Sequence, residues 1–320
     1  MRTGFSTTFD AVVSACSVVS KFGRKMNQPL VSIAIVTYNQ VEFIGECIES
    51  CLAQGYQNFE IVIADDGSKD GTIDVLKSFY SRFPGKITVC LSAENAGITE
   101  NHNRALRGCR GKYISWLGGD DLMLPDKISA QVALMEEDPE CAICYHDLEV
   151  FDTSTGRRYS NFNAGLKIDG DIRAVIRYGT FNGASSTMVR RDSVPPGGFD
   201  ESLKTASDWL FWIETLSSGG TIRYIDRPLG RYRRHQGNST RQSKRVTPGE
   251  LDHLRTCQIL IARYPHYFCD IIYSYGGKLF ELRKKLPYAR AVFASFLLRP
   301  SARAVAALTL YSASLGKLKV

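Results

Sequence analysis

The sequence predicts an α/β protein with a mostly parallel central sheet covered by helices and with a C-terminal helical appendage. One observation is that four apolar segments rich in β-branched residues alternate with helical patterns; they are residues 30–37, 59–64, 87–91 and 113–117. Such alternation is typical of parallel strands joined by helical crossovers. A second observation is that polar loops follow three of these segments. In a parallel sheet all three loops lie at one edge, where ligands bind.

The remaining segments are consistent with this fold. Apolar residues recur at helical spacing from Ile44 to Leu52 and again from Thr72, and a third helical stretch carries His102. Beyond residue 140 the pattern is less regular. There we expect strands at 141–152 and 185–194, helices at 171–179 and from Asp208, and a strand from 221 that turns into a basic loop. Residues 250–320 have a helical pattern.

Composition and charge restrict the classes of function. The 320 residues are 44% hydrophobic and 23% charged, which is ordinary for a globular protein. A net charge of +7 favours anionic partners such as phosphates or acidic membrane surfaces, and it does not indicate a nucleic-acid partner. The nine cysteines include no second CxxC to complete a zinc site, so we interpret them as buried thiols of a reducing compartment.

The two ends differ in composition from the middle of the chain. Residues 1–28 make a poor signal peptide, and we expect either a disordered leader or an over-extended start with Met26 as the initiator. We expect residues 29–245 to form the α/β domain and residues 246–320 a C-terminal helical region. In residues 246–320 no acidic residue follows Glu281, and apolar faces alternate with Arg and Lys. This composition suits helices at a membrane interface, although a tail packed on the domain would also fit.

Two adjacent carboxylates stand where the fourth predicted strand ends. Asp120 and Asp121 follow Gly118-Gly119 and precede Pro125. Paired carboxylates at this edge suit Mg²⁺ or Mn²⁺ carrying phosphates. The alternative is an acidic helix start that interacts favourably with the helix dipole. No GxGxxG or GxxxxGK[ST] motif occurs in these loops, which argues against a dinucleotide cradle or a P-loop.

Two further stretches carry candidate chemistry. Asp208 directly precedes Trp209, and burial among the aromatic residues would raise its pKa and suit a general base. The alternative is an ordinary Asp that caps a helix. Seven Arg and Lys residues lie between Arg227 and Arg245, with His235 among them. They could dock a diphosphate or an anionic lipid surface, or form a solvated charged loop.

Four motifs in order resemble the family 2 glycosyltransferases of GT-A fold: VSIAIVTYNQ, VIADDGSKDGT, NAGITENHNRAL and GKYISWLGGDDLMLPDKI. The segments SDWLFW and YRRHQGNS fit the acceptor half of that family, so the resemblance covers residues 30–240. It implies transfer of a sugar from a nucleotide diphosphate sugar, with a UDP-sugar favoured, to an acceptor hydroxyl. It also implies inversion of the anomeric centre and a divalent metal, Mn²⁺ or Mg²⁺.

The resemblance also implies roles for individual residues. It assigns the nucleotide sugar to Thr37, Tyr38, Asn39, Asp65, Asp66, Asn95, Gly97, His102 and Asp121. It assigns the metal to Asp120, Asp121 and His235. It assigns Asp208 as the catalytic base that takes the proton of the acceptor hydroxyl.

The sequence departs from the family pattern at two positions. Gly118 stands where the family often has the first carboxylate, and His102 stands where it often has Arg, so we expect the charge of His102 to depend on pH. The expected acceptor is a glycan or lipid-linked intermediate of bacterial-type surface polysaccharide, lipopolysaccharide or capsule assembly. The expected location is cytoplasmic, peripheral on the inner face of the cell membrane. One rival is a non-catalytic sugar-nucleotide-binding module; an oxidoreductase is disfavoured because the glycine-rich fingerprint is missing.

Overall fold

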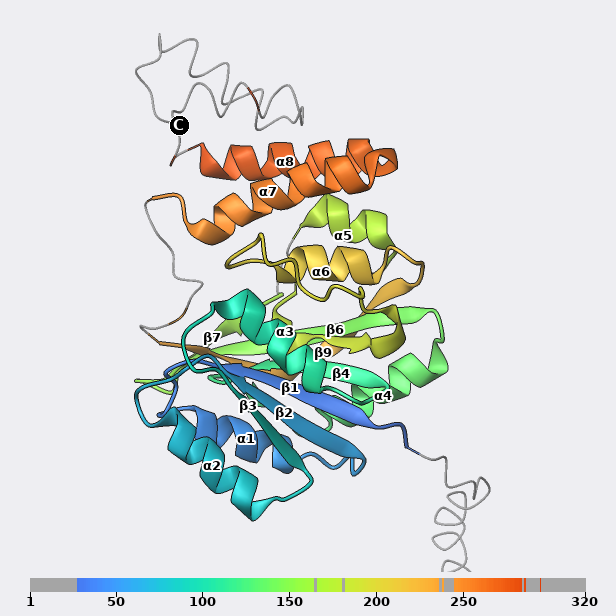
Figure 1. The fold of residues 1–320 in the computed structure, drawn as a ribbon. Helices are drawn as coiled ribbons and strands as arrows, with labels where there is room; N and C mark the ends of the chain where they lie inside the picture. Colours follow the sequence, from blue (N-terminus) through green and yellow to red (C-terminus); the bar gives the residue numbers. More distant parts are fainter. Residues whose placement is uncertain are drawn as a thin grey trace, which may run out of the picture.

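We describe the protein from a computed structural model, which describes residues 28–163, 166–179, 182–235, 238, 245–283, 285 and 294. The predicted leader up to residue 27, the start at Met26 and most of the predicted C-terminal tail lie outside these residues. A single sheet lies at the centre, with helices on both faces (Figure 1). The strand order is β3-β2-β1-β4-β8-β6-β9-β5, and β7 pairs with β6.

The first half of the sheet confirms the four predicted strands. Its strands are β1 (Val31–Thr37), β2 (Phe59–Asp65), β3 (Ile87–Leu91) and β4 (Tyr113–Gly118). They pair in parallel, with β1 between β2 and β4. Helices cover both faces of these strands, which explains why every residue of β2 is buried and why the segment is continuously apolar.

The second half of the sheet is mixed and differs in two places from the expectation. Its strands are β5 (Leu122–Met123), β6 (Cys141–Asp152), β7 (Arg158–Asn161), β8 (Met188–Arg190) and β9 (Thr221–Arg234). The strand predicted at 185–194 is confined to β8, between short 3₁₀ turns η1 (Ala184–Ser186) and η2 (Arg191–Ser193). The basic residues predicted as a loop continue β9 as far as Arg234, because their backbone pairs in parallel with β6 up to Asp152.

Two layers of helices cover the sheet, and a third layer lies outside one of them (Figure 1). One face packs against α1 (Ile44–Leu52), α2 (Thr72–Arg82) and α4 (Lys127–Glu137). The other face packs against α3 (Ile98–Gly108), α5 (Ile172–Tyr178) and α6 (Asp208–Thr215). The outer layer is α7 (Pro248–Arg263) and α8 (Phe268–Leu282), joined by η3 (Pro265–Tyr267). Among the described helices, none is both long enough and apolar enough to cross a membrane.

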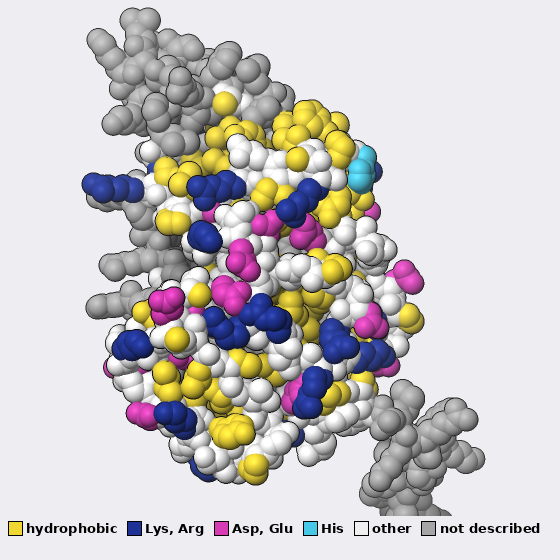
Figure 2. Space-filling model, in the orientation of Figure 1, with side chains coloured by type: hydrophobic (Ala, Val, Ile, Leu, Met, Phe, Trp, Pro, Cys, Tyr) yellow, Lys and Arg dark blue, Asp and Glu magenta, His cyan; other side chains and the backbone are white. Residues whose placement is uncertain are grey.

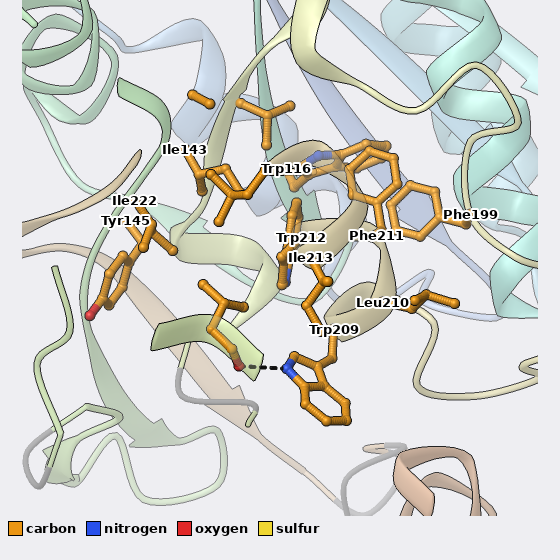
Figure 3. Close-up of a cluster of buried hydrophobic side chains, with 14 of the residues drawn as sticks. Trp116, Ile143, Tyr145, Phe199, Trp209, Leu210, Phe211, Trp212, Ile213 and Ile222 are labelled. Atoms are coloured by element: carbon orange, nitrogen blue, oxygen red, sulfur yellow. Dashed lines mark hydrogen bonds between the residues drawn. The ribbon is translucent and has the colours of Figure 1, made fainter. Parts of the chain in front are cut away.

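Aromatic side chains fill the core between β4 and α6 (Figure 3). Phe199 and Phe211 stack with ring centroids 3.9 Å apart, and Trp116 of β4 meets both rings edge-on. Trp209 is buried as well, and its indole N–H donates to the carbonyl oxygen of Val175 at 3.0 Å. These contacts fix the start of α6, and with it Asp208, relative to the end of β4.

Candidate active site

A cavity of about 380 Å³ lies at the carboxyl ends of β1, β2 and β4. The register pairs Thr37 with Asp65 and Val36 with Gly118, so the three strands end side by side. This confirms the prediction that the polar loops after these strands lie together at one edge of the sheet. The lining residues are Val36, Thr37, Tyr38, Gln40, Asp66, Asn95, Ile98, Asn101, His102, Trp116, Leu117, Gly118, Asp120, Asp121, Phe162, Gly183, Ala184, Ser185, Tyr232 and Asn238.

The structure brings most of the predicted site residues to this cavity, but not all of them. The predicted residues that line it are Thr37, Tyr38, Asp66, Asn95, His102, Asp120 and Asp121. Those outside the lining are Asn39, Asp65, Gly97, Asp208 and His235. Of the latter, His235 bonds to the lining residue Asp120 directly, and Asn39, Asp65 and Gly97 form hydrogen bonds within the loops.

Asp65 and Asp66 have different surroundings although they are adjacent. Asp65 is fully buried, and its Oδ1 accepts the backbone N–H groups of Gly67 and Ser68 at 3.1 and 2.9 Å. It therefore shapes the loop and does not reach the cavity. Asp66 lines the cavity and accepts the backbone N–H groups of Ala96 and Gly97 at 3.0 and 2.9 Å. These bonds join the second polar loop to the loop before α3.

Asn39 also acts within the loops. Its Oδ1 accepts the N–H of Lys69 at 2.8 Å, and its own N–H donates to the hydroxyl of Ser68 at 2.8 Å. Its φ of 51° is in the left-handed region, which Asn adopts more readily than most residues. Asn39 thus connects the first polar loop to the second and leaves the neighbouring Tyr38, 43% exposed, in the cavity wall.

Asp120 presents its carboxylate to the cavity together with a histidine. Its Oδ2 accepts hydrogen bonds from His235 Nε2 at 2.9 Å and from the Asn238 side chain at 3.3 Å. The side chains of Asp120 and His235 are each 16% exposed. Asn238 also accepts the backbone N–H of His235 at 2.7 Å, which fixes the turn after β9.

Asp121 is more deeply buried than Asp120 and joins three segments. Its Oδ2 accepts the hydroxyl of Ser185 at 2.5 Å, and its Oδ1 accepts the backbone N–H of Arg233 at 2.9 Å. Burial, and the charge of Asp120 next to it, raise the pKa of the Asp121 carboxyl. Both oxygens already have protein partners, so Asp121 anchors η1 and the end of β9 to the loop after β4.

The side chains around Asp120 are suited to a divalent cation whose remaining coordination positions are filled by a bound ligand. No group of three or more His, Cys, Asp or Glu side chains suited to a metal occurs among the residues that the structure describes. Asp120 lines the cavity, and His235 Nε2, just outside the lining, lies 2.9 Å from Asp120 Oδ2; a cation held by these two side chains would replace the hydrogen bond between them. Mg²⁺ and Mn²⁺ are commonly held by one or two protein groups and completed by substrate phosphates, so this donor set suits either ion.

His102 is a neutral side chain in the cavity wall. It is 8% exposed, and its ring packs against Trp116 and Phe199 at centroid distances of 5.4 and 4.9 Å. Its Nδ1 lies 2.8 Å from the carbonyl oxygen of Ile98, which can only accept, so Nδ1 carries the proton. Burial lowers the pKa of His102 to about 4. The expectation that its charge depends on pH is therefore wrong around neutrality, where the imidazole is uncharged.

Asp208, the predicted base, does not line the cavity. It is the first residue of α6, and its Oδ1 accepts the N–H of Trp209 at 2.9 Å. The hydroxyl of the preceding Ser207 lies 3.0 Å from that of Thr99, whose neighbour Ile98 lines the cavity. Burial raises the pKa of the Asp208 carboxyl, as the neighbouring aromatic residues led us to expect.

Comparison with known proteins decides the family. The sequence model of glycosyl transferase family 2 matches residues 32–194, just over half of the chain. The chain belongs to glycosyl transferase family 2. Four uncharacterized glycosyltransferases of Rickettsia species, one of them from Rickettsia felis, are 30–32% identical over 59–74% of this chain. The chain spans 38–60% of the length of these relatives. TuaG of Bacillus subtilis, a putative teichuronic acid biosynthesis glycosyltransferase, is 28% identical over 64% of this chain and 79% of its own.

Solved structures of glycosyltransferases confirm the predicted GT-A fold. TarS of S. aureus in complex with UDP-GlcNAc matches with a TM-score of 0.62 at 15% identity, over 90% of each chain. The mannosyltransferase PcManGT of Pyrobaculum calidifontis, in complex with GDP-Man and Mn²⁺, matches with a TM-score of 0.56 at 20% identity, over 92% of this chain and 82% of that one. At these identities the likeness concerns the fold alone.

Gly118 stands where the family often has a carboxylate, and the structure gives a steric reason for a glycine at this position. A Cβ placed on Gly118 would lie 2.9 Å from Asp120 Oδ1, so a side chain there would displace that carboxylate. A Cβ on Gly119 would lie 2.5 Å from Gln40 Oε1 and 2.9 Å from the Cβ of Thr37. The glycine pair thus lets the end of β4 lie against β1, with Asp120 in its present position.

The sequence did not allow us to predict several of the residues that line the cavity. They are Gln40, Ile98, Asn101, Phe162, Ser185, Tyr232 and Asn238. Asn238 could have been found, because it belongs to the YRRHQGNS segment that already fitted the family. Asn101 is similar: it is part of the third motif, and its side-chain amide donates to the carbonyl oxygens of Thr37 and Ala64 at 3.2 and 3.0 Å. Phe162 and Ser185 lie in loops 153–170 and 179–187, which we expect to choose acceptor and sugar, but no local pattern marks these two residues.

Proposed function

We propose that the protein is an inverting, metal-dependent glycosyltransferase that moves a sugar from a nucleotide diphosphate sugar to an acceptor hydroxyl. The observation that carries this proposal is the charge of the cavity. Its acidic side chains are Asp66, Asp120 and Asp121. Asp66 Oδ1 lies 3.5 Å from the guanidinium of Arg104, and burial raises the pKa of Asp121, so the charge that faces a diphosphate is mainly that of Asp120. A diphosphate adds further negative charge next to Asp120, and a divalent cation between the two would stabilise its binding.

The proposed donor is a UDP-sugar. Support comes from the likeness to the TarS fold, which has been solved with UDP-GlcNAc. In this chain Thr37, Tyr38 and Asp66 would bind the nucleoside, because they come from adjacent strand ends and line the same part of the cavity. Asp66 is already oriented by the two backbone N–H groups that it accepts, which lowers the entropy cost of binding.

Asp120 and His235 would hold Mn²⁺ or Mg²⁺, which stabilises the negative charge of the diphosphate as it leaves. The protein holds these two side chains in place through the rest of the site. Asp121 fixes the loop after β4 to Ser185 and to the backbone of Arg233. The Arg233 side chain donates to the backbone carbonyl of Asp120 at 2.7 Å, which orients that residue further.

Asp208 would act as the base of a single displacement. Its carboxylate takes the proton of the acceptor hydroxyl, whose oxygen forms a bond to the anomeric carbon while the bond from that carbon to the diphosphate oxygen breaks. The electron pair of the broken bond stays on the diphosphate, and the anomeric configuration inverts. Burial raises the pKa of Asp208, which makes its carboxylate a stronger base than an exposed one.

The proposed acceptor is a lipid-linked or glycan intermediate of surface-polysaccharide assembly, at the cytoplasmic face of the membrane. The likeness to TuaG supports the class of product. For membrane contact, α7 and α8 carry the exposed side chains Leu251, Ile261 and Phe268, and Figure 2 shows hydrophobic side chains gathered over these outer helices. The basic tail composition that suggested a membrane interface lies mostly outside the described residues.

A ligand panel tests the proposed function. Thermal unfolding should be measured with UDP, UDP-sugars and GDP-mannose, each with Mn²⁺ or with a chelator, because a ligand that binds the native state raises the melting temperature. We expect a UDP-sugar to stabilise the protein only with Mn²⁺ and to be hydrolysed slowly to UDP. Stabilisation without any turnover, with or without acceptor sugars, would instead identify a non-catalytic binding module. No stabilisation by any nucleotide sugar would refute the proposal.

A further inference from the structure

An exposed aromatic side chain stands in the cavity wall on the other side of β4 from the proposed nucleoside residues. Phe162 follows β7, lines the cavity and is 39% exposed. In the sheet, β2 and β1 lie on one side of β4, whereas β6 and β9, which flank Phe162, lie on the other. The cavity therefore runs from the proposed nucleoside residues, past Asp120, to Phe162.

Buried polar contacts hold the backbone around Phe162 in place. Asp147 of β6 is 4% exposed and accepts the side-chain amide of Asn161 at 2.8 Å and the backbone N–H of Asn163 at 3.0 Å. The N–H of Phe162 itself donates to the carbonyl oxygen of Leu148 at 2.8 Å. These bonds fix the backbone on both sides of Phe162, which limits the positions that its ring can take.

A second aromatic ring completes the wall. Tyr232 of β9 also lines the cavity, and its ring centroid lies 5.4 Å from that of Phe162 with an interplanar angle of 58°. The guanidinium group of Arg234 lies 5.0 Å from the Tyr232 ring centroid. On the other side, Gly183 lies so close that a Cβ there would be 3.7 Å from the Phe162 ring and 3.1 Å from Leu148. Two tilted rings thus form an apolar surface beside the carboxylates.

We propose that Phe162 and Tyr232 form the subsite for the acceptor sugar, with the apolar C–H face of a pyranose ring lying against the Phe162 ring. This inference rests on the proposed transferase function. A pyranose has one face rich in C–H groups and hydroxyls at its rim, and an aromatic surface beside polar groups matches both. The position beyond Asp120 suits the acceptor, because the acceptor hydroxyl must approach the anomeric carbon from the side away from the diphosphate.

Steady-state kinetics of Phe162→Ala test this subsite. The probes are a UDP-sugar that the parent protein hydrolyses and a panel of methyl hexosides and methyl N-acetylhexosaminides, with UDP release as the readout. We expect Phe162→Ala to raise the acceptor KM by about tenfold, and to leave the donor dissociation constant and the acceptor-free hydrolysis rate within about twofold of the parent values. Phe162→Trp keeps an aromatic face and should retain acceptor use.

A matched control variant shows whether the effect is specific to Phe162, and different outcomes refute the acceptor subsite and the proposed function. Tyr159, 55% exposed on the adjacent strand β7 and outside the cavity lining, provides the control: Tyr159→Ala should change neither constant. Equal loss of donor affinity in Phe162→Ala would place the ring in the donor site and overturn the inference. So would an unchanged acceptor KM, or a parent protein that hydrolyses donor but responds to no glycoside. Failure of every donor to bind would refute the proposed function, and the inference with it.

Discussion

A buried lysine beneath the candidate site provides a quantitative test of the structure. Lys127, at the start of α4, is fully buried, and its Nζ donates to the carbonyl oxygens of Ser185 at 2.8 Å and Trp116 at 3.4 Å. No described carboxylate forms an ion pair with it. Lys127 thus holds η1 against the end of β4, next to the Ser185 hydroxyl that bonds to Asp121. We consider the replacement Lys127→Met, which keeps the length of the side chain and removes the charge.

The size of the effect follows from the pKa of Lys127. Burial lowers this pKa from 10.5 to about 8, a difference that corresponds to about 3 kcal/mol. Below about pH 8 the folded and unfolded states both carry the proton, and the folded protein bears the whole cost of burying the charge. Between about pH 8 and pH 10.5 only the unfolded state keeps the proton, so the stability conferred at this position rises with pH. The free energy of unfolding of the parent protein should rise by about 2 kcal/mol between pH 7.5 and pH 10 because of this lysine.

Urea unfolding of the parent protein and of Lys127→Met over this pH range measures the effect. Near pH 7.5 we expect similar stabilities, because the variant loses a charge-assisted hydrogen bond of about 1.5–3 kcal/mol and also loses the cost of the buried charge. By about pH 10 the parent should be more stable by about 2 kcal/mol. The control is Lys77→Met on α2, where the lysine side chain is 67% exposed and the two curves should stay parallel. Parallel curves for Lys127→Met as well would refute the buried, carbonyl-bonded position of this lysine.

Three further predictions concern the reaction and the binding of UDP. Asp208→Asn should lower the rate of transfer by about 10²–10⁴-fold with donor affinity unchanged; a variant with parental turnover would exclude Asp208 as the base. Because burial raises the Asp208 pKa, the kcat of the parent should fall as the pH drops through that raised value, and a flat acid limb would contradict this reasoning. Gly119→Ala places a Cβ 2.5 Å from Gln40 Oε1 and should weaken UDP binding, as measured by calorimetry; unchanged affinity would show that the strands can separate there without cost.

The first half of the fold could be predicted because its strands are buried on both faces. Continuous apolar runs such as residues 59–64 require a helix layer on each side, and this fixes a parallel sheet and the edge at which its loops meet. Asp66 and Asp120 could therefore be placed in one site from the sequence alone. The structural roles of their neighbours Asp65 and Asp121 could not be predicted, because contacts with other segments decide whether a carboxylate is available to a ligand or already bonded within the protein.

The second half depends on contacts that the local sequence does not encode. The partner of Asp121 is Ser185, 64 residues away in a 3₁₀ turn that has no periodicity to detect. β9 continues through a basic run because β6 pairs with its backbone, and backbone pairing is insensitive to side-chain charge. Phe162 follows a turn-rich stretch, and its position depends on Asp147, a residue of another strand.

Calorimetric titration with UDP tests most directly that Asp120 binds a cation which carries the diphosphate. UDP should be titrated with Mn²⁺ and with a chelator into the parent protein, Asp120→Asn and Asp126→Asn. Asp126 is an exposed carboxylate directly before α4 and outside the cavity lining, with a φ of 66° that Asn tolerates, and so provides the matched control. We predict Mn²⁺-dependent binding in the parent and in Asp126→Asn, and affinity lower by at least about tenfold in Asp120→Asn. Equal affinity with the chelator, or in Asp120→Asn, would contradict a metal-carried diphosphate at Asp120.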